Sequence, residues 1–121
     1  MPIITPETEE EFRKVLAEIK GPVAVEFVAT DCDYCEAEIP KIDKLVNECA
    51  NVTVLRADAD KLSALADKFL GEYGGTPTIY YSEKPEELAA VENPEGAEKF
   101  ELKDSSALRR RLKCARKPKA T

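Results

Sequence analysis

The feature that most constrains this sequence is an apolar run that leads into two closely spaced cysteines. Residues 23–29 are apolar at both alternating sets of positions except for one acid, Glu26. Such a run predicts a strand that is covered on both faces, as the central strands of parallel sheets are. A short polar turn follows, and Cys32-x-x-Cys35 then opens a helical pattern of apolar residues. The sequence therefore predicts two thiols at the point where a buried strand gives way to a helix.

Helix and strand patterns alternate along the rest of the chain. Before the first strand, Thr5 and Pro6 suit the start of a helix, which we expect at 6–20. After the cysteines we expect a helix through Cys49 that contains Pro40, then a strand at 52–57 and a helix capped by Asp60. A strand at 78–81 and a loop or short helical excursion at 83–96 should follow. The chain should end in a strand at 99–102 and a last helix capped by Asp104 or Ser105. Proline inside a helix removes one backbone hydrogen bond and predicts a kink.

The order of these elements defines the fold class. Strand–helix–strand units predict parallel strands with right-handed crossovers, and the last two strands predict an antiparallel addition. We therefore expect an α/β fold with a central mixed sheet and helices on both of its faces. A chain of 121 residues suffices for one such domain.

Charge and composition exclude several functional classes. The part through Leu108 holds 11 basic and 24 acidic residues, whereas the remainder carries a charge of +7. An acidic body argues against general nucleic-acid binding. The basic end predicts a solvated helix face and tail, with contact to an acidic partner or polyanion as the alternative. Histidine is absent, which excludes histidine-dependent triads and histidine-ligated metals.

Cysteine usage and hydropathy bear on the compartment. The four cysteines are too few and too irregularly spaced for a disulfide scaffold. No stretch approaches the roughly 20 apolar residues of a membrane span, and the N-terminal residues lack the basic and apolar regions of a signal peptide. We therefore expect a cytoplasmic protein without membrane contact, in which a cysteine pair stays reduced unless it is being used.

Several features, taken in order, resemble the thioredoxin-fold family of thiol-disulfide oxidoreductases. They are the acid in the first strand (Glu26), the motif Cys32-x-x-Cys35, a proline inside the following helix (Pro40), the step Thr76-Pro77 before a strand, and a terminal strand–helix pair. The resemblance covers nearly the whole chain, with 83–96 as an insertion. It implies a thioredoxin fold. We expect a thioredoxin-like domain at 1–115 and, from its terminal position, a basic and disordered tail at 116–121.

The two motif cysteines are expected to differ in role. Cys32 begins a helix, where unpaired N–H groups and the helix dipole stabilise a thiolate, so it is the expected nucleophile. Cys35 faces inward and is expected to resolve the mixed disulfide that Cys32 forms with a substrate. Half of a zinc site is an alternative, but zinc prefers four ligands and Cys49 and Cys114 are isolated. An iron–sulfur cluster bridged between two subunits is another.

The acid inside the first strand is the next candidate. Burial of a carboxyl raises its pKa, because desolvation disfavours the charged form. The resemblance implies that Glu26 lies beneath the motif and exchanges a proton with Cys35 as a general base, although the family usually has aspartate there. In the alternative, the Glu26 side chain reaches an edge of the sheet and pairs with Arg56 or a lysine.

A proline is expected to shape the substrate-binding surface. The resemblance implies a cis peptide bond at Pro77, beside the cysteines, which lets the backbone of Thr76 pair with an extended substrate. The alternative is a trans proline that begins an edge strand. Thioredoxins typically carry isoleucine where this chain has Thr76, which predicts a different substrate preference or redox poise.

Residues around the motif also depart from the family pattern. Asp31 stands where tryptophan usually precedes the first cysteine, Asp33-Tyr34 replaces the usual Gly-Pro, and the glycine that usually ends the penultimate strand is missing. We expect Asp33 and Tyr34 to contact substrate. The nearby acids are Asp31, Asp33, Glu36 and Glu38. They oppose ionisation of Cys32 and raise its pKa, which predicts a reductant rather than a disulfide donor, and they favour basic substrate proteins.

Together these features predict a monomeric protein disulfide reductase with no bound cofactor and no metal. Its expected partners are disulfide-containing proteins and a separate reductase that supplies electrons. One alternative is glutaredoxin-like use of glutathione, which Tyr34 favours and the long first helix and Glu26 disfavour. Another is a non-catalytic redox-sensing interaction module. We expect Cys49 and Cys114 to be structural, with a regulatory disulfide or dimer through Cys114 as an alternative.

Overall fold

A mixed sheet forms the centre of the molecule. The computed structural model describes residues 3–49, 51–71 and 74–112. Within them, five strands lie in the order β1-β3-β2-β4-β5. The strands are β1 (Ile3–Ile4), β2 (Val23–Val28), β3 (Thr53–Asp58), β4 (Thr78–Ser82) and β5 (Glu101–Leu102). β1 and β2 run parallel to β3, whereas β4 is antiparallel to β2 and β5 is antiparallel to β4. The predicted mixed sheet is confirmed.

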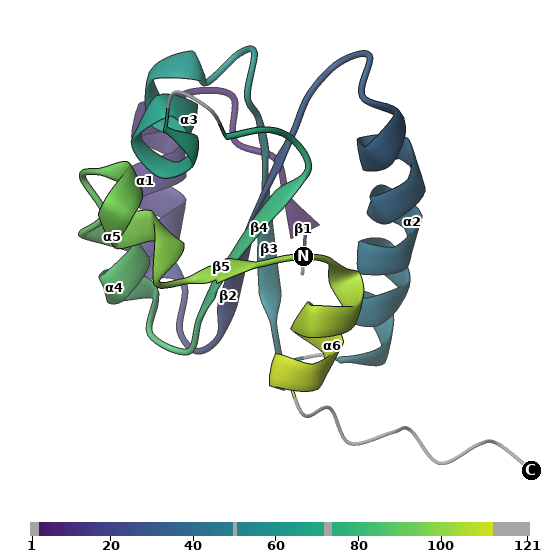
Figure 1. The fold of residues 1–121 in the computed structure, drawn as a ribbon. Coiled ribbons are helices and arrows are strands. Elements are labelled where there is room, and N and C mark those ends of the chain that lie inside the picture. Colours follow the sequence, from purple (N-terminus) through teal and green to yellow (C-terminus); the bar gives the residue numbers. More distant parts are fainter. Residues whose placement is uncertain (1–2, 50, 72–73, 113–121) are drawn as a thin grey trace, which may run out of the picture.

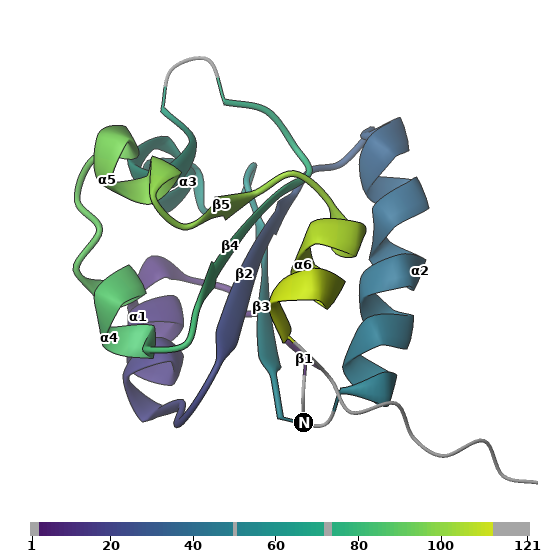
Figure 2. The same cartoon turned by 60° about the horizontal axis from the view of Figure 1, so that its bottom comes forward.

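Helices cover both faces of this sheet, as Figure 1 and the rotated view in Figure 2 show. One face carries α1 (Glu9–Glu18), α3 (Ser63–Leu70), α4 (Pro85–Ala89) and α5 (Pro94–Glu98), and the other carries α2 (Asp33–Glu48) and α6 (Ser105–Leu112). The short helices α4 and α5 account for the stretch at 83–96, which was expected to be a loop or helical excursion. The predicted arrangement of helices on both faces is therefore confirmed.

Strand β2 is buried on both sides, as its apolar run predicts. Val23, Val25 and Phe27 pack in the core beneath α1 and α3. Ala24 packs in the second core, which includes residues of α2 and α6. Since successive side chains of a strand alternate between the faces, Glu26 shares the α2 face with Ala24.

The sheet register brings two distant segments together. In the antiparallel pair β2–β4, Phe27 lies opposite Thr78 and Val23 lies opposite Ser82. The loop that follows β2 and the loop that precedes β4 therefore meet at one end of the sheet. Cys32 belongs to the first loop and Pro77 to the second.

The first helix begins later than predicted. We expected it at 6–20 after the cap Thr5, but α1 begins at Glu9. The hydroxyl of Thr8 accepts the backbone N–H of Glu11 at 3.0 Å, which makes Thr8 the cap. Pro6 is buried ahead of the helix rather than in its first turn.

The cap predicted for the third helix is also wrong. Helix α3 begins at Ser63, and Leu62 occupies its cap position without a side-chain bond. The carboxylate of Asp60 instead accepts the backbone N–H of Thr30 at 3.3 Å. Asp58 accepts the N–H of Asp60 at 2.8 Å, so the carboxylates of this segment satisfy loop backbone.

The ends of the sheet were predicted least well. The residues of β1 gave no strand signal, yet they pair with β3. A strand was expected at 99–102, but β5 has two residues because the N–H of Phe100 bonds the carbonyl of Ala97 at 2.9 Å. The last helix begins as predicted, with Asp104 accepting the N–H of Ala107 at 2.9 Å.

The proposed boundary at 115, the tail and Cys114 lie outside the described residues. None of the helices among the described residues is long and apolar enough to cross a membrane.

Candidate active site

The two motif cysteines form a disulfide at the start of α2. Their Cα atoms are 5.2 Å apart. Cys32 is the N-cap of α2, and its Sγ accepts the backbone N–H of Cys35 at 3.1 Å. Cys32 is partly exposed, whereas Cys35 is 2% exposed. One sulfur can therefore meet a substrate while the other lies inside, as the two predicted roles require.

The loop before β4 lies against the first cysteine. The peptide bond between Thr76 and Pro77 is cis, which confirms that prediction. The Thr76 hydroxyl donates to Cys32 Sγ at 3.5 Å, and the Thr76 carbonyl oxygen lies 3.5 Å from the same sulfur. Sequence positions 44 residues apart thus form one surface around the disulfide.

Glu26 is buried and paired with a cation. Its side chain is 1% exposed, and its Oε1 accepts a bond from Arg56 Nε at 2.5 Å. Burial raises the pKa of this carboxyl, and the Arg56 guanidinium opposes that rise. The structure thus combines two readings of the sequence, because Glu26 lies in the interior and also bonds Arg56.

A third residue joins this pair. Arg56 Nη2 donates to Asp43 Oδ1 of α2 at 2.7 Å. The parallel register places Arg56 directly beside Glu26 in the sheet. Sequence reasoning named Arg56 only as an alternative partner and did not identify Asp43. A signal was present, since Arg56 interrupts the apolar strand at 52–57 with a charge, as Glu26 does in its own strand.

The segment between β2 and α2 presents acids and one aromatic ring to solvent. Asp31, Asp33 and Glu36 are exposed. Tyr34 is 78% exposed and is the one large hydrophobic side chain of the described residues that is exposed in this way. Asp31 has φ of 55°, in the left-handed region that aspartate and asparagine tolerate better than most residues. Glu38 accepts the backbone N–H of Ser105 at 3.2 Å, so this acid also ties α2 to α6.

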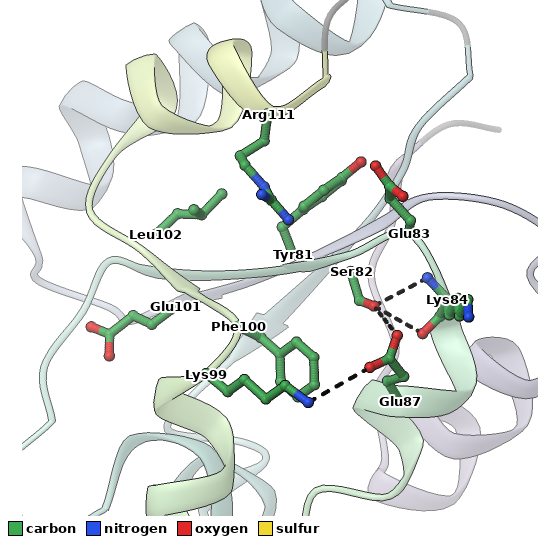
Figure 3. A pocket seen from close by; sticks show the side chains of 10 residues that line it. All are labelled: Tyr81, Ser82, Glu83, Lys84, Glu87, Lys99, Phe100, Glu101, Leu102 and Arg111. Atoms are coloured by element: carbon green, nitrogen blue, oxygen red, sulfur yellow. Dashed lines mark hydrogen bonds and ion pairs between the residues drawn. The ribbon is translucent and has the colours of Figure 1, made fainter.

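A separate cleft lies at the opposite end of the sheet. Tyr81 and Ser82 line it, and Ser82 pairs with Val23 at the end of β2 that is remote from the cysteines. Figure 3 shows Lys99 facing Glu87 in this cleft, with Lys99 Nζ 4.0 Å from a Glu87 oxygen. The Ser82 hydroxyl donates to the carbonyl of Lys84 at 3.0 Å. The described residues that line this cleft include no cysteine.

The other predicted sites can be placed only in part. Cys49 is 2% exposed at the end of α2, in the core between that helix and the sheet. Among residues 3–49, 51–71 and 74–112, no group of three or more cysteine and acidic side chains is placed to hold a metal ion.

A mixed sheet between two helical layers, with a Cys-x-x-Cys disulfide at a helix N-terminus beside a cis-proline, defines a thiol–disulfide redox protein. The family model described as Thioredoxin matches residues 3–105. The chain belongs to the thioredoxin family.

Individual relatives agree with this assignment. A thioredoxin of Aspergillus fumigatus is 34% identical over 71 residues, which are 59% of this chain and 66% of that protein. An H-type thioredoxin of Ricinus communis is 31% identical over 88 residues, covering 73% of this chain and 70% of that protein. The thioredoxin of Fasciola hepatica has the same fold, with a TM-score of 0.67 at 21% identity over 90% of this chain and 95% of that chain. The chain thus spans just under two thirds of the Aspergillus relative.

Proposed function

We propose that this protein reduces disulfide bonds in other proteins by dithiol–disulfide exchange. The observation that carries the proposal is the Cys32–Cys35 pair, one sulfur accessible and the other buried, at the start of α2. The backbone N–H of Cys35 aimed at Cys32 Sγ supports a thiolate on Cys32 in the reduced form. Relatives bearing thioredoxin names support the same activity.

The exchange proceeds in two steps. The Cys32 thiolate attacks one sulfur of the substrate disulfide, that bond breaks, and the other substrate sulfur leaves and takes a proton from solvent. Cys35 then gives up its proton and attacks Cys32 Sγ, which breaks the mixed disulfide and releases the second substrate sulfur. Two electrons have passed from the cysteines to the substrate. A separate reductase returns the Cys32–Cys35 disulfide to the dithiol.

Glu26 takes the proton that Cys35 releases in the second step. Its burial beneath α2 and its raised pKa support this role, because a general base works best when its pKa lies near the operating pH. The pairing with Arg56 keeps the carboxylate form accessible. Glutathione is not needed as a co-substrate in this scheme.

Substrate binds across the exposed surface around Cys32. Thr76 and Pro77 offer backbone to an extended substrate segment, and Asp33 and Tyr34 contact its side chains. The exposure of Tyr34 and the proximity of Thr76 to Cys32 support this surface. The acids around the motif favour basic protein substrates through the rate of encounter. We propose a monomer that works in a reducing compartment such as the cytoplasm.

Turnover separates this function from a redox-sensing module. With dithiothreitol in excess, catalytic amounts of the protein should reduce many equivalents of a disulfide-bonded protein, at a rate proportional to the amount added. A sensor would react once and then stop at one equivalent. The rate of substrate thiol release with and without the protein distinguishes the two, and a rate equal to that of dithiothreitol alone would reject catalysis.

The acids beside the motif should set the redox poise. Replacing Asp31 and Asp33 by asparagine removes two negative charges near Cys32, favours its thiolate and makes the disulfide more oxidising. We expect a reduction potential less negative by on the order of 10 mV, measured by equilibration with glutathione buffers. The backbone at Asp31 is retained because asparagine also tolerates the left-handed region. The shift should shrink in high salt; a shift to more negative potential would contradict the charge argument.

A further inference from the structure

The two oxygens of Glu26 have unequal surroundings. Oε1 accepts a bond from Arg56 Nε at 2.5 Å. Oε2 is buried and has no hydrogen-bond partner among the described residues. A buried carboxylate oxygen without a partner is costly and uncommon. The unpaired Oε2 of Glu26 therefore needs an explanation, and the hydrogen bonds of Arg56 provide one.

Arg56 divides its guanidinium between two acids. A guanidinium can hold a single carboxylate through two parallel bonds, which would satisfy both oxygens of Glu26. Here Nε bonds Glu26, while Nη2 bonds Asp43 Oδ1 at 2.7 Å. Asp43 lies on α2 with its side chain 43% exposed, and the Arg56 side chain is 16% exposed. Nη2 carries two N–H groups, and its bond to the half-exposed acid on the helix holds the guanidinium in an orientation in which Nε alone bonds Glu26.

We propose that Asp43 is a positioning residue that holds Arg56 Nη2 and so leaves Glu26 Oε2 unpaired to accept the proton of Cys35. The inference rests on the proposed role of Glu26 as the base in the second exchange step. In that step the proton passes from Cys35 to Oε2, the Cys35 sulfur bonds Cys32 Sγ, and the substrate sulfur leaves with the electron pair of the broken bond. A second bond from Arg56 to Oε2 would compete with that proton.

The charges that face Glu26 come from two elements. β3 contributes Arg56, which lowers the pKa of Glu26, and α2 contributes Asp43 and Glu38, which raise it. The β4 residue opposite Glu26 is Ile79, which carries no charge. Removing the charge of Asp43 therefore acts in one direction, since it deletes a repulsion and also releases Arg56 toward Glu26. Both effects stabilise the carboxylate and weaken the base.

The second exchange step can be observed directly with 5,5′-dithiobis(2-nitrobenzoate) as the disulfide. Attack by reduced Cys32 releases one thionitrobenzoate ion, and resolution by Cys35 releases the second, so the two steps appear as two absorbance phases. We plot the rate constant of the second phase against pH. For Asp43→Asn we expect the acid limb of this profile to move to lower pH, and the plateau rate to fall about two- to fivefold. The first phase should be unchanged. In parallel, carboxyl-carbon NMR should show a lower pKa for Glu26.

The controls separate the inference from the function on which it rests. Asp67→Asn makes the same charge change at an exposed position of α3 on the opposite face of the sheet, and its second phase should match that of the wild type. In a Glu26→Gln background, Asp43→Asn should have no further effect on the second phase. A second phase that Glu26→Gln leaves unaltered would reject Glu26 as the base. Loss of the acid limb in Glu26→Gln, combined with an unshifted profile in Asp43→Asn, would overturn the role of Asp43 alone.

Discussion

Replacing Cys32 by serine is expected to abolish reduction of protein disulfides, by at least about a thousandfold. A serine hydroxyl is not ionised near neutral pH and cannot form the mixed disulfide that exchange requires. Serine differs from cysteine by one atom and can also accept the backbone N–H that Cys32 Sγ accepts from Cys35. The loss should therefore occur without loss of the fold, which circular dichroism checks.

Cys35→Ser provides the matched control for that result. It should also lose turnover, but for a different reason, because Cys32 still attacks and the mixed disulfide is then not resolved. The variant should accumulate one covalently bound substrate equivalent per chain. Turnover by Cys32→Ser at more than a small fraction of the wild-type rate would show that another group is the nucleophile.

Arg56→Met is expected to lower the free energy of unfolding by about 2–3 kcal/mol near neutral pH. Methionine retains much of the apolar stem of arginine but removes the cation that bonds Glu26. The carboxylate is then buried without a partner, and breaking a buried pair by removing one member costs more than the pair itself contributes. Asp43 also loses its partner, at smaller cost because it is half-exposed. Urea unfolding of the reduced protein measures the change.

The pH dependence of this loss identifies its cause. Burial already raises the pKa of Glu26 in the folded protein, and removal of Arg56 should raise it further. Between the unfolded and folded pKa values, the native state binds more protons than the unfolded state, so stability falls as pH rises through that interval. The deficit of Arg56→Met should accordingly be larger at about pH 8 than at about pH 5. It should also shrink in a Glu26→Gln background, whereas an equal loss in every case would assign it to packing.

Periodicity predicted the interior of the fold and failed at its ends. The composition of residues 23–29 was enough to predict that this strand is buried, since a strand apolar on both faces fits only the middle of a layered sheet. The start of the first helix was missed because Thr5 and Thr8 are both chemically suitable caps. Burial of Pro6 ahead of the helix, which is a tertiary effect, selects Thr8. The strand β1 is too short to show any alternation and exists through its pairing with β3.

The candidate site was also predicted from the sequence only in part. The order of Glu26, Cys32, Cys35 and the Thr76-Pro77 step was sufficient to identify the family and to predict the cis bond. The contact of Arg56 with Asp43 could not be predicted, because it depends on the β2–β3 register and on which face of α2 turns toward β3. These are properties of packing between elements, and no local pattern within one element encodes them.

The measurement that tests the central claim most directly is mass-spectrometric mapping of the adduct formed by Cys35→Ser. The reduced variant is mixed with a disulfide-bonded protein, excess thiol is blocked, and the linked peptides are identified after digestion. We expect a single disulfide between the peptide that carries Cys32 and a substrate cysteine, reversible by dithiothreitol. Adducts at Cys49 or Cys114 in place of Cys32, or no adduct at all, would contradict exchange through the Cys32–Cys35 pair.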